Sequence, residues 1–74
     1  MKHQLDATNL LCPMPVIRTQ NRVAELEVND ILDVRCTDPG VLHDIPAWCR
    51  INGHEVLDQR REDGVIIITV KVCE

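Results

Sequence analysis

The alternation of apolar and polar residues predicts four short strands in this chain. The clearest is residues 31–37, in which every second side chain is apolar. Residues 65–72 are apolar on both faces, which is typical of a strand in the middle of a sheet. Residues 4–8 and 54–61 alternate more weakly, and a tight hairpin turn is predicted at Asp63-Gly64. The predicted inner faces carry Leu5, Ala7, Leu32, Val34, Cys36, Ile66, Ile68, Val70 and Val72.

Two helices are predicted between these strands. The first covers residues 13–26, and Pro13 and Pro15 suit its first turn, where backbone N–H groups lack a helical partner. The second opens at Asp38-Pro39 and ends at Asn52-Gly53. Pro46 conflicts with an unbroken helix, so we expect a kinked or two-part element with Asp44 capping a fresh start. The apolar stripes are Val16, Ile17, Val23, Ala24 and Leu26 in the first helix and Val41, Leu42, Ile45, Trp48 and Cys49 in the second.

The order of these elements predicts the fold class. A β-α-β-α-β-β chain with right-handed crossovers has both helices on one face of the sheet. If the last strand inserts between the second and third, the sheet is mixed, with order 1-2-4-3. We therefore expect an α+β, two-layer sandwich that forms a single domain over residues 1–74. On the uncovered face Ile31, Val65 and Ile67 would form a small exposed apolar patch, although scattered surface aliphatics without a role are the favoured interpretation.

Composition narrows the function classes. The net charge is −4, which argues against long-range attraction to nucleic acid. No N-terminal apolar segment and no apolar run of membrane-spanning length is present, so we expect a cytoplasmic protein without a membrane anchor. The chain has one aromatic residue, Trp48, and its core must therefore be aliphatic.

Cys12 is the strongest candidate for chemistry. It directly precedes Pro13, so it lies at or beside the N-cap of the first helix, where free N–H groups and the helix dipole favour a thiolate. Pro15 stands where a dithiol motif would have its second cysteine, which argues against thioredoxin-like chemistry. A half-buried apolar residue that ends a strand is an equally good interpretation of Cys12 from the residues alone.

The other cysteines and the histidines predict no further site. No CxxC pair and no familiar zinc spacing occurs, so we expect reduced thiols, no metal and no cofactor. Cys36 and Cys49 lie on predicted core faces, whereas Cys73, at the end of the last strand, is interpreted as an incidental surface thiol. His43 and His54 are not expected to lie beside Cys12.

Two blocks of sequence resemble a known family. Leu11-Cys12-Pro13-Met14-Pro15 contains the CPxP signature of the TusA/SirA family of small sulfur-transfer proteins. A second block, Asp38-Pro39 followed by residues 44–49 and 53–55, resembles the second-helix motif of that family in the same order. The similarity covers residues 5 to 73. It departs from the family at residues 28–30, where Val-Asn-Asp replaces a common Pro-Gly turn, and this concerns only the turn.

The resemblance implies a function as well as the same two-layer fold. It implies a sulfurtransferase acting as a carrier, with Cys12 as the nucleophile that holds sulfane sulfur as a persulfide. It also implies a cysteine desulfurase or other persulfide donor and a downstream sulfur-carrier protein as acceptor. The sulfur would be destined for tRNA thiolation, molybdenum cofactor synthesis or sulfur oxidation, and the residues do not distinguish among these.

Other residues near the motif have competing interpretations. Arg18 and Arg22 lie one helical turn apart and could contact a partner or stabilise the thiolate, although a solvated face is favoured. For Asp38 the favoured interpretation is a helix cap, and the alternative is a catalytic carboxylate. Asp6 is either a polar strand residue or a group that orients the approach to Cys12.

Two other classes of function remain open at this stage. The predicted fold resembles an RNA-binding domain of a translation initiation factor, but the acidic balance opposes direct nucleic-acid binding. The other class is a regulatory interaction module in which Cys12 is only a structural helix cap.

Overall fold

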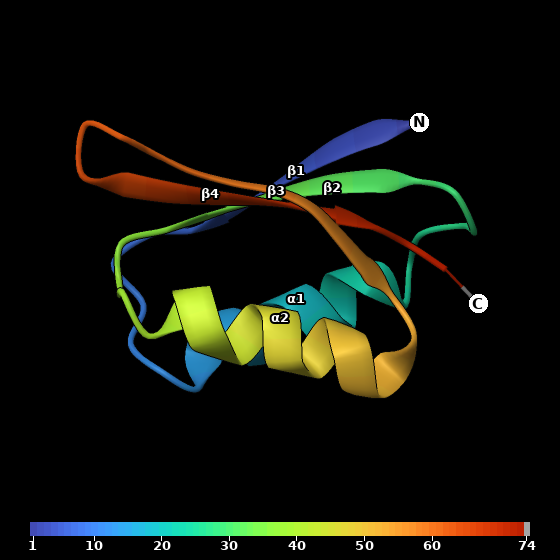
Figure 1. Ribbon diagram of the computed structural model, residues 1–74, viewed down its shortest axis with the longest axis horizontal. Helices are drawn as coiled ribbons and strands as arrows, with labels where there is room; N and C mark the ends of the chain where they lie inside the picture. Colours follow the sequence, from blue (N-terminus) through green and yellow to red (C-terminus); the bar gives the residue numbers. More distant parts are fainter. Residues whose placement is uncertain (74) are drawn as a thin grey trace.

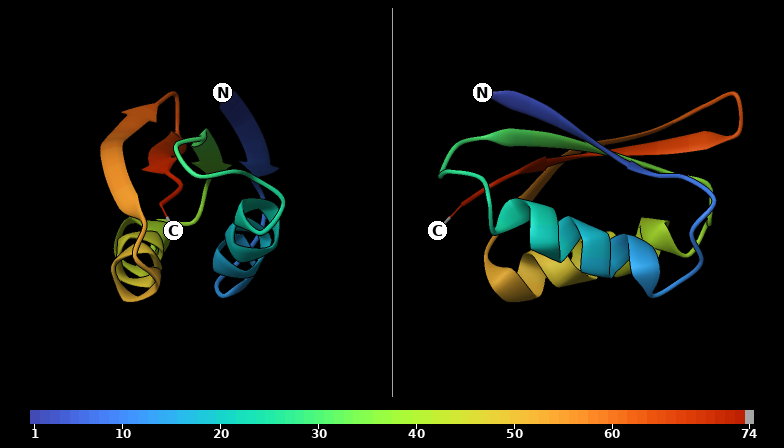
Figure 2. Two further views of the ribbon diagram at one scale, coloured as in Figure 1. Left: turned by 90° about the vertical axis from the view of Figure 1, so that its right-hand side faces the viewer. Right: turned by 180° about the vertical axis from the view of Figure 1, so that it is seen from behind.

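The computed structural model describes residues 1–73 and has two layers, a four-stranded sheet and two helices. The elements are β1 (Lys2–Ala7), α1 (Met14–Val23), β2 (Ile31–Cys36), α2 (Val41–Asn52), β3 (Glu55–Glu62) and β4 (Val65–Lys71). Figure 1 shows both helices below the sheet, and the end-on view in Figure 2 places them side by side on that one face. The sheet order is β1-β2-β4-β3, as predicted. β1 and β2 are parallel, and β4 pairs antiparallel with β2 and β3.

The centre of the sheet supplies most of the core. Leu32, Val34 and Cys36 of β2 are fully buried against the helices, which confirms the predicted alternation. Ile68 and Val70 of β4 are also fully buried. Since β4 pairs on both sides, its backbone groups are satisfied within the sheet, while every second side chain fills the space between the sheet and the helices. The core is therefore aliphatic, as the composition requires.

The uncovered face of the sheet differs from the prediction. Ile67 is only 5% exposed, so the expected exposed apolar patch does not form. In the sheet register Ile67 lies between Arg35 of β2 and Arg60 of β3, whose methylene stems can shield it while their guanidinium groups reach water. Ile31 and Val65 are partly buried as well.

A buried polar pair lies on the same face. Asp33 is 4% exposed, and its Oδ1 accepts a hydrogen bond of 2.7 Å from the Thr69 hydroxyl. Its other carboxylate oxygen lies 3.4 Å from Lys2 Nζ. These contacts satisfy a charge that the alternating pattern had placed in solvent.

The first helix is shorter than predicted. α1 begins at Met14 after an N-cap at Pro13, and after Val23 the chain tightens into turns with i to i−3 hydrogen bonds. Its buried side chains are Pro15, Thr19 and Val23, whereas the predicted Ile17 and Ala24 are exposed. Thr19 is accommodated in the core because its hydroxyl donates to the carbonyl oxygen of Pro15 at 2.8 Å.

The second helix is continuous, so the expected two-part helix is wrong. α2 contains Pro46 without interruption, because Ile45 and Cys49 are buried on either side of it and their packing holds the helix together. Asp44 does not cap a fresh start. The helix ends where predicted, at Gly53, which takes the left-handed conformation at φ 80°. None of the described helices is long and apolar enough to cross a membrane.

The stability of the fold should depend on the β4 side chains that face the helices. We expect Ile68→Ala to lower the free energy of unfolding by about 2–5 kcal/mol, because it leaves a cavity under the central strand. Urea denaturation followed by Trp48 fluorescence measures the change. Ile51→Ala is the matched control, because Ile51 is 80% exposed on α2 and the same truncation should cost less than about 0.5 kcal/mol. Equal midpoints for the two variants would contradict this account of the core.

The polar pair on the outer face gives a second stability prediction. Thr69→Val keeps the shape of the side chain but removes the hydroxyl that donates to Asp33. We expect a loss of about 1–3 kcal/mol, because a buried carboxylate oxygen loses its partner. The same urea experiment measures it. Thr37→Val is the comparison, because it removes an exposed hydroxyl that accepts from the Asn9 N–H, and we expect a smaller loss since water can replace that partner. Equal losses for the two variants would contradict the role of burial.

Candidate functional site

The parallel pairing of β1 and β2 brings two loops together. The register aligns Ala7 with Cys36, so both strands end at the same edge of the sheet. The chain from β1 to α1 and the chain from β2 to α2 therefore run close to each other, on the left in Figure 1. A hydrogen bond of 2.9 Å from the Asn9 N–H to Thr37 Oγ1 joins them. The N-terminal ends of both helices consequently point to one site.

Cys12 lies in the first of these loops and is exposed to solvent. Its backbone N–H donates to Asp38 Oδ2 at 3.0 Å, and its thiol donates to Asp44 Oδ2 at 2.8 Å. Asp38 follows β2, whereas Asp44 belongs to the first turn of α2. The site thus combines one accessible thiol with two carboxylates that come from the other half of the chain.

The environment of Cys12 keeps it protonated, contrary to the sequence-based prediction of a thiolate. The hydrogen bond to Asp44 is the largest cause that raises the pKa of the Cys12 thiol above its usual value. Desolvation and the negative charges of Asp44 and Asp38 raise that pKa further. The exposed sulfur is therefore a hydrogen-bonded thiol at neutral pH.

The N-terminus of α1 does not compensate for these carboxylates. Pro13 and Pro15 have no N–H, and the Met14 N–H is bonded to the carbonyl oxygen of Leu11 at 2.9 Å. The Ile17 N–H is bonded to the Pro13 carbonyl oxygen at 3.1 Å. The prolines that mark the start of the helix thus remove donors that would have stabilised a thiolate.

Asp38 has a different role from the helix cap that was expected. The N-cap of α2 is Gly40, and Asp38 Oδ1 accepts from the Gly40 N–H at 3.1 Å to close a turn before the helix. Hydrogen bonds from the N–H groups of Gly40 and Cys12 lower the pKa of the Asp38 carboxyl. Asp38 therefore stays charged and fixes the backbone of Cys12 against the second loop.

Sequence reasoning missed Asp44 as a neighbour of Cys12. The two residues are 32 positions apart, and the pattern offered Asp44 only as a helix cap. A usable signal existed, because carboxyl ends of parallel strands share an edge and the helices that follow them begin side by side. Asp6 does not contact Cys12 by a hydrogen bond. Its carboxylate instead accepts from the Thr8 hydroxyl at 2.6 Å and the Thr8 N–H at 3.0 Å.

The segments that hold the site also expose apolar side chains. Leu11, next to Cys12, is 77% exposed, and Met14 and Ile17 of α1 are exposed to a smaller degree. Leu42 in the first turn of α2, predicted in the core stripe, is exposed as well. An accessible thiol flanked by apolar side chains and carboxylates is a surface that a protein partner can cover.

The two arginines of α1 do not act on the thiol. Arg18 is exposed, and Arg22 lies 3.6 Å from the carboxylate of Glu25. Neither is among the groups that shift the pKa of Cys12. Their possible contact with a partner stays a prediction.

The other cysteines differ from Cys12 in exposure. Cys36 and Cys49 are buried in the core, and burial raises the pKa of each thiol to about 11. Their predicted packing role is confirmed. Cys73 is partly exposed, and its N–H donates to His54 Nδ1 at 3.0 Å.

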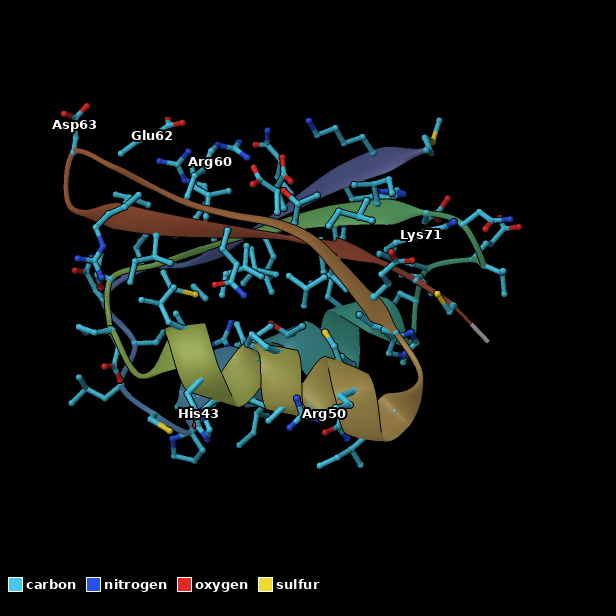
Figure 3. All side chains as sticks on the ribbon, viewed as in Figure 1. His43, Arg50, Arg60, Glu62, Asp63 and Lys71 are labelled. Carbon is cyan, nitrogen blue, oxygen red and sulfur yellow. The ribbon has the colours of Figure 1, made fainter. Side chains whose placement is uncertain are left out.

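The positions of His43 and His54 differ. His54 stacks on Trp48 with 5.2 Å between the ring centroids, and His43 is exposed on the side of α2 away from the sheet (Figure 3). Over residues 1–73, no hydrogen bond joins either histidine to Cys12, and no three His, Cys, Asp or Glu side chains are placed to hold a metal ion.

Comparison with known proteins identifies the family. The family model described as "Sulfurtransferase TusA" matches residues 3–72. A putative sulfur carrier protein of Bacillus subtilis, YrkI, is 44% identical over 62 residues, which are 84% of this chain and 83% of the relative. The sulfur carrier protein TusA of Pseudomonas aeruginosa is 40% identical over 67 residues, covering 90% of this chain and 85% of that protein.

A solved structure agrees with the sequence matches. The crystal structure of a SirA-like protein from Desulfitobacterium hafniense has a TM-score of 0.84 and 26% sequence identity, and the match covers 97% of this chain and 99% of that one. The sheet order, the CPxP segment before α1 and the family match over nearly the whole length agree with one another. The chain belongs to the TusA family of sulfur carrier proteins.

Proposed function

We propose that this protein carries sulfane sulfur as a persulfide on Cys12. The observation that supports this most directly is exposure, because Cys12 is exposed within the CPxP segment while Cys36 and Cys49 are buried. A group that exchanges sulfur between proteins must be reached by both of them. Among the thiols of residues 1–73, only Cys73 is also accessible, and it lies at the end of the sheet rather than at the helix N-termini.

The transfer needs only thiol chemistry. The Cys12 sulfur attacks the terminal sulfur of a donor persulfide, and the bond between the two donor sulfurs breaks. The donor cysteine sulfur leaves with the bonding electrons and takes up the proton that Cys12 released. The terminal sulfur keeps its own hydrogen, so the products are the Cys12 persulfide and a donor thiol. An acceptor thiol later repeats the step on Cys12, and neither step consumes a cofactor, a metal, an oxidant or a reductant.

The partners implied by this chemistry are proteins. The donor would be a cysteine desulfurase or another persulfide protein, and the acceptor a downstream sulfur carrier in tRNA thiolation, molybdenum cofactor synthesis or sulfur oxidation. Exposed Leu11 and Met14 beside Cys12 support docking of a protein surface there. Arg18, exposed on α1, and Arg22 would contribute rim contacts. The free cysteines agree with a reducing, cytoplasmic location.

Intact-mass spectrometry tests the carrier function. We expect the protein to gain one sulfur, about 32 Da, after anaerobic incubation with a cysteine desulfurase and cysteine, because the Cys12 thiol accepts the terminal sulfur. Cys12→Ser should gain nothing. Cys73→Ser is the matched control, since it removes the other accessible thiol and should load like the wild type.

The possible failures point to different conclusions. If the wild type gains no sulfur from several desulfurases and from a small persulfide, the carrier function is wrong and Cys12 has a structural role. If Cys12→Ser gains sulfur while Cys73→Ser does not, the carrier thiol is Cys73.

A further inference from the structure

The hydrogen bond between Cys12 and Asp44 is unexpected in a protein whose cysteine must act as a nucleophile. The thiolate is the reactive form, and a carboxylate 2.8 Å from the sulfur opposes its formation. Asp38 adds a second negative charge on the same side, and both carboxylates lie within 4 Å of the position that a Cβ on Gly40 would occupy. The thiol is accessible, yet the free protein holds it in its less reactive form.

We propose that Asp44 determines which sulfur donors can use Cys12. Asp44 holds the thiol unreactive toward small donors. It releases the thiol to a donor protein that presents a cationic side chain to the Asp38–Asp44 carboxylate pair. This inference rests on the proposed carrier function of Cys12. It assigns a specificity role to a residue that contacts the reacting sulfur directly.

The carboxylate pair disfavours small donors in two ways. Asp44 raises the pKa of Cys12, so less thiolate is present at neutral pH to attack any donor. Small persulfides and other sulfane-sulfur compounds are commonly anionic, and two carboxylates beside the thiol repel them. The protein as a whole is also acidic, with a net charge of −4.

A protein donor with a cationic side chain removes both obstacles. A lysine or arginine placed against Asp44 pairs with the carboxylate and competes with its hydrogen bond to the Cys12 thiol. Docking also covers exposed Leu11 and Met14 and excludes water, which strengthens the ion pair. Cys12 then loses its proton and attacks the donor's terminal sulfur, and the proton ends on the departing donor cysteine.

The effect of Asp44 on the reactivity of the Cys12 thiol can be tested without sulfur transfer. We would measure alkylation of Cys12 by iodoacetamide, a neutral reagent, between pH 6 and 10 in a Cys73→Ser background. Asp44→Asn keeps the shape and a hydrogen-bonding oxygen but removes the charge. We expect it to speed alkylation at pH 7 by roughly threefold to tenfold and to move the pH profile to lower pH, because the gain in thiolate exceeds the loss of nucleophilicity.

Asp63→Asn is the matched control for the change in net charge. Asp63 lies on the exposed β3–β4 turn with φ 51°, a conformation that asparagine tolerates. Figure 3 shows it on the sheet side of the molecule, whereas His43, the neighbour of Asp44, lies on the helix side. We expect its alkylation rate to equal that of the wild type. An alkylation rate for Asp44→Asn that is unchanged or lower would overturn the proposal.

Donor choice tests the specificity role. We would compare loading of Cys12 from glutathione persulfide and from a cysteine desulfurase by intact mass. Asp44→Asn should load faster from the small donor but slower from the desulfurase, by roughly threefold or more, because it loses the partner of the donor's cation. A merely structural role of Asp44 would lower both rates. Two rates that change in the same direction would therefore overturn the proposal.

A measurement on the unmodified protein is independent of how the variant folds. Raising the salt concentration should slow loading from the desulfurase, since it screens an ion pair at the docking surface, and should not slow loading from glutathione persulfide. Equal salt dependence of the two would contradict the proposal. If the wild type accepts sulfur from neither donor, the carrier function itself is wrong. The alkylation experiment still decides whether Asp44 lowers the reactivity of the Cys12 thiol.

Discussion

The parallel pairing of β1 with β2 is the constraint on which the site depends. It brings the carboxyl ends of both strands to one edge, so the loops before α1 and α2 lie against each other. Right-handed crossovers then place both helices on the same face of the sheet. Both contacts of Cys12 with a carboxylate join the segment that leads into α1 to the segment that leads into and begins α2. A change of one residue in that register would separate the thiol from both aspartates even if each helix formed unchanged.

The same constraint decides the protonation of Cys12. A helix N-terminus stabilises an anion only through N–H groups that are free to point at it. In α1 the prolines remove two of these donors and a turn uses the N–H of Met14, so fewer donors remain for the sulfur. Asp38, before α2, and Asp44, in its first turn, add two negative charges. These charges therefore outweigh the effect of the N-terminal end of α1 on the Cys12 thiol.

Much of the fold could be predicted from the sequence, because strands with one buried face must alternate. Leu32, Val34 and Cys36 show the rule in β2, and the apolar content of β4 correctly indicated a central strand. Burial on the uncovered face could not be predicted. Asp33 is buried there because Thr69 and Lys2, from β4 and β1, lie beside it, and local alternation contains no information about such partners.

The candidate site was predictable only in part, and for the same reason. The CPxP segment identified Cys12, but Asp44 joins it from 32 residues away, and this contact reverses the expected state of the thiol. The carboxylates that keep the Cys12 thiol protonated would also affect a persulfide on Cys12. A persulfide is a stronger acid than the corresponding thiol, so after the proposed transfer the terminal SH would lose its proton to water and leave an anionic sulfur beside two carboxylates. Like charges at short range destabilise that state. In the proposed mechanism, the environment that delays loading until a partner docks therefore also favours passing the sulfur on, and both effects come from one pair of aspartates.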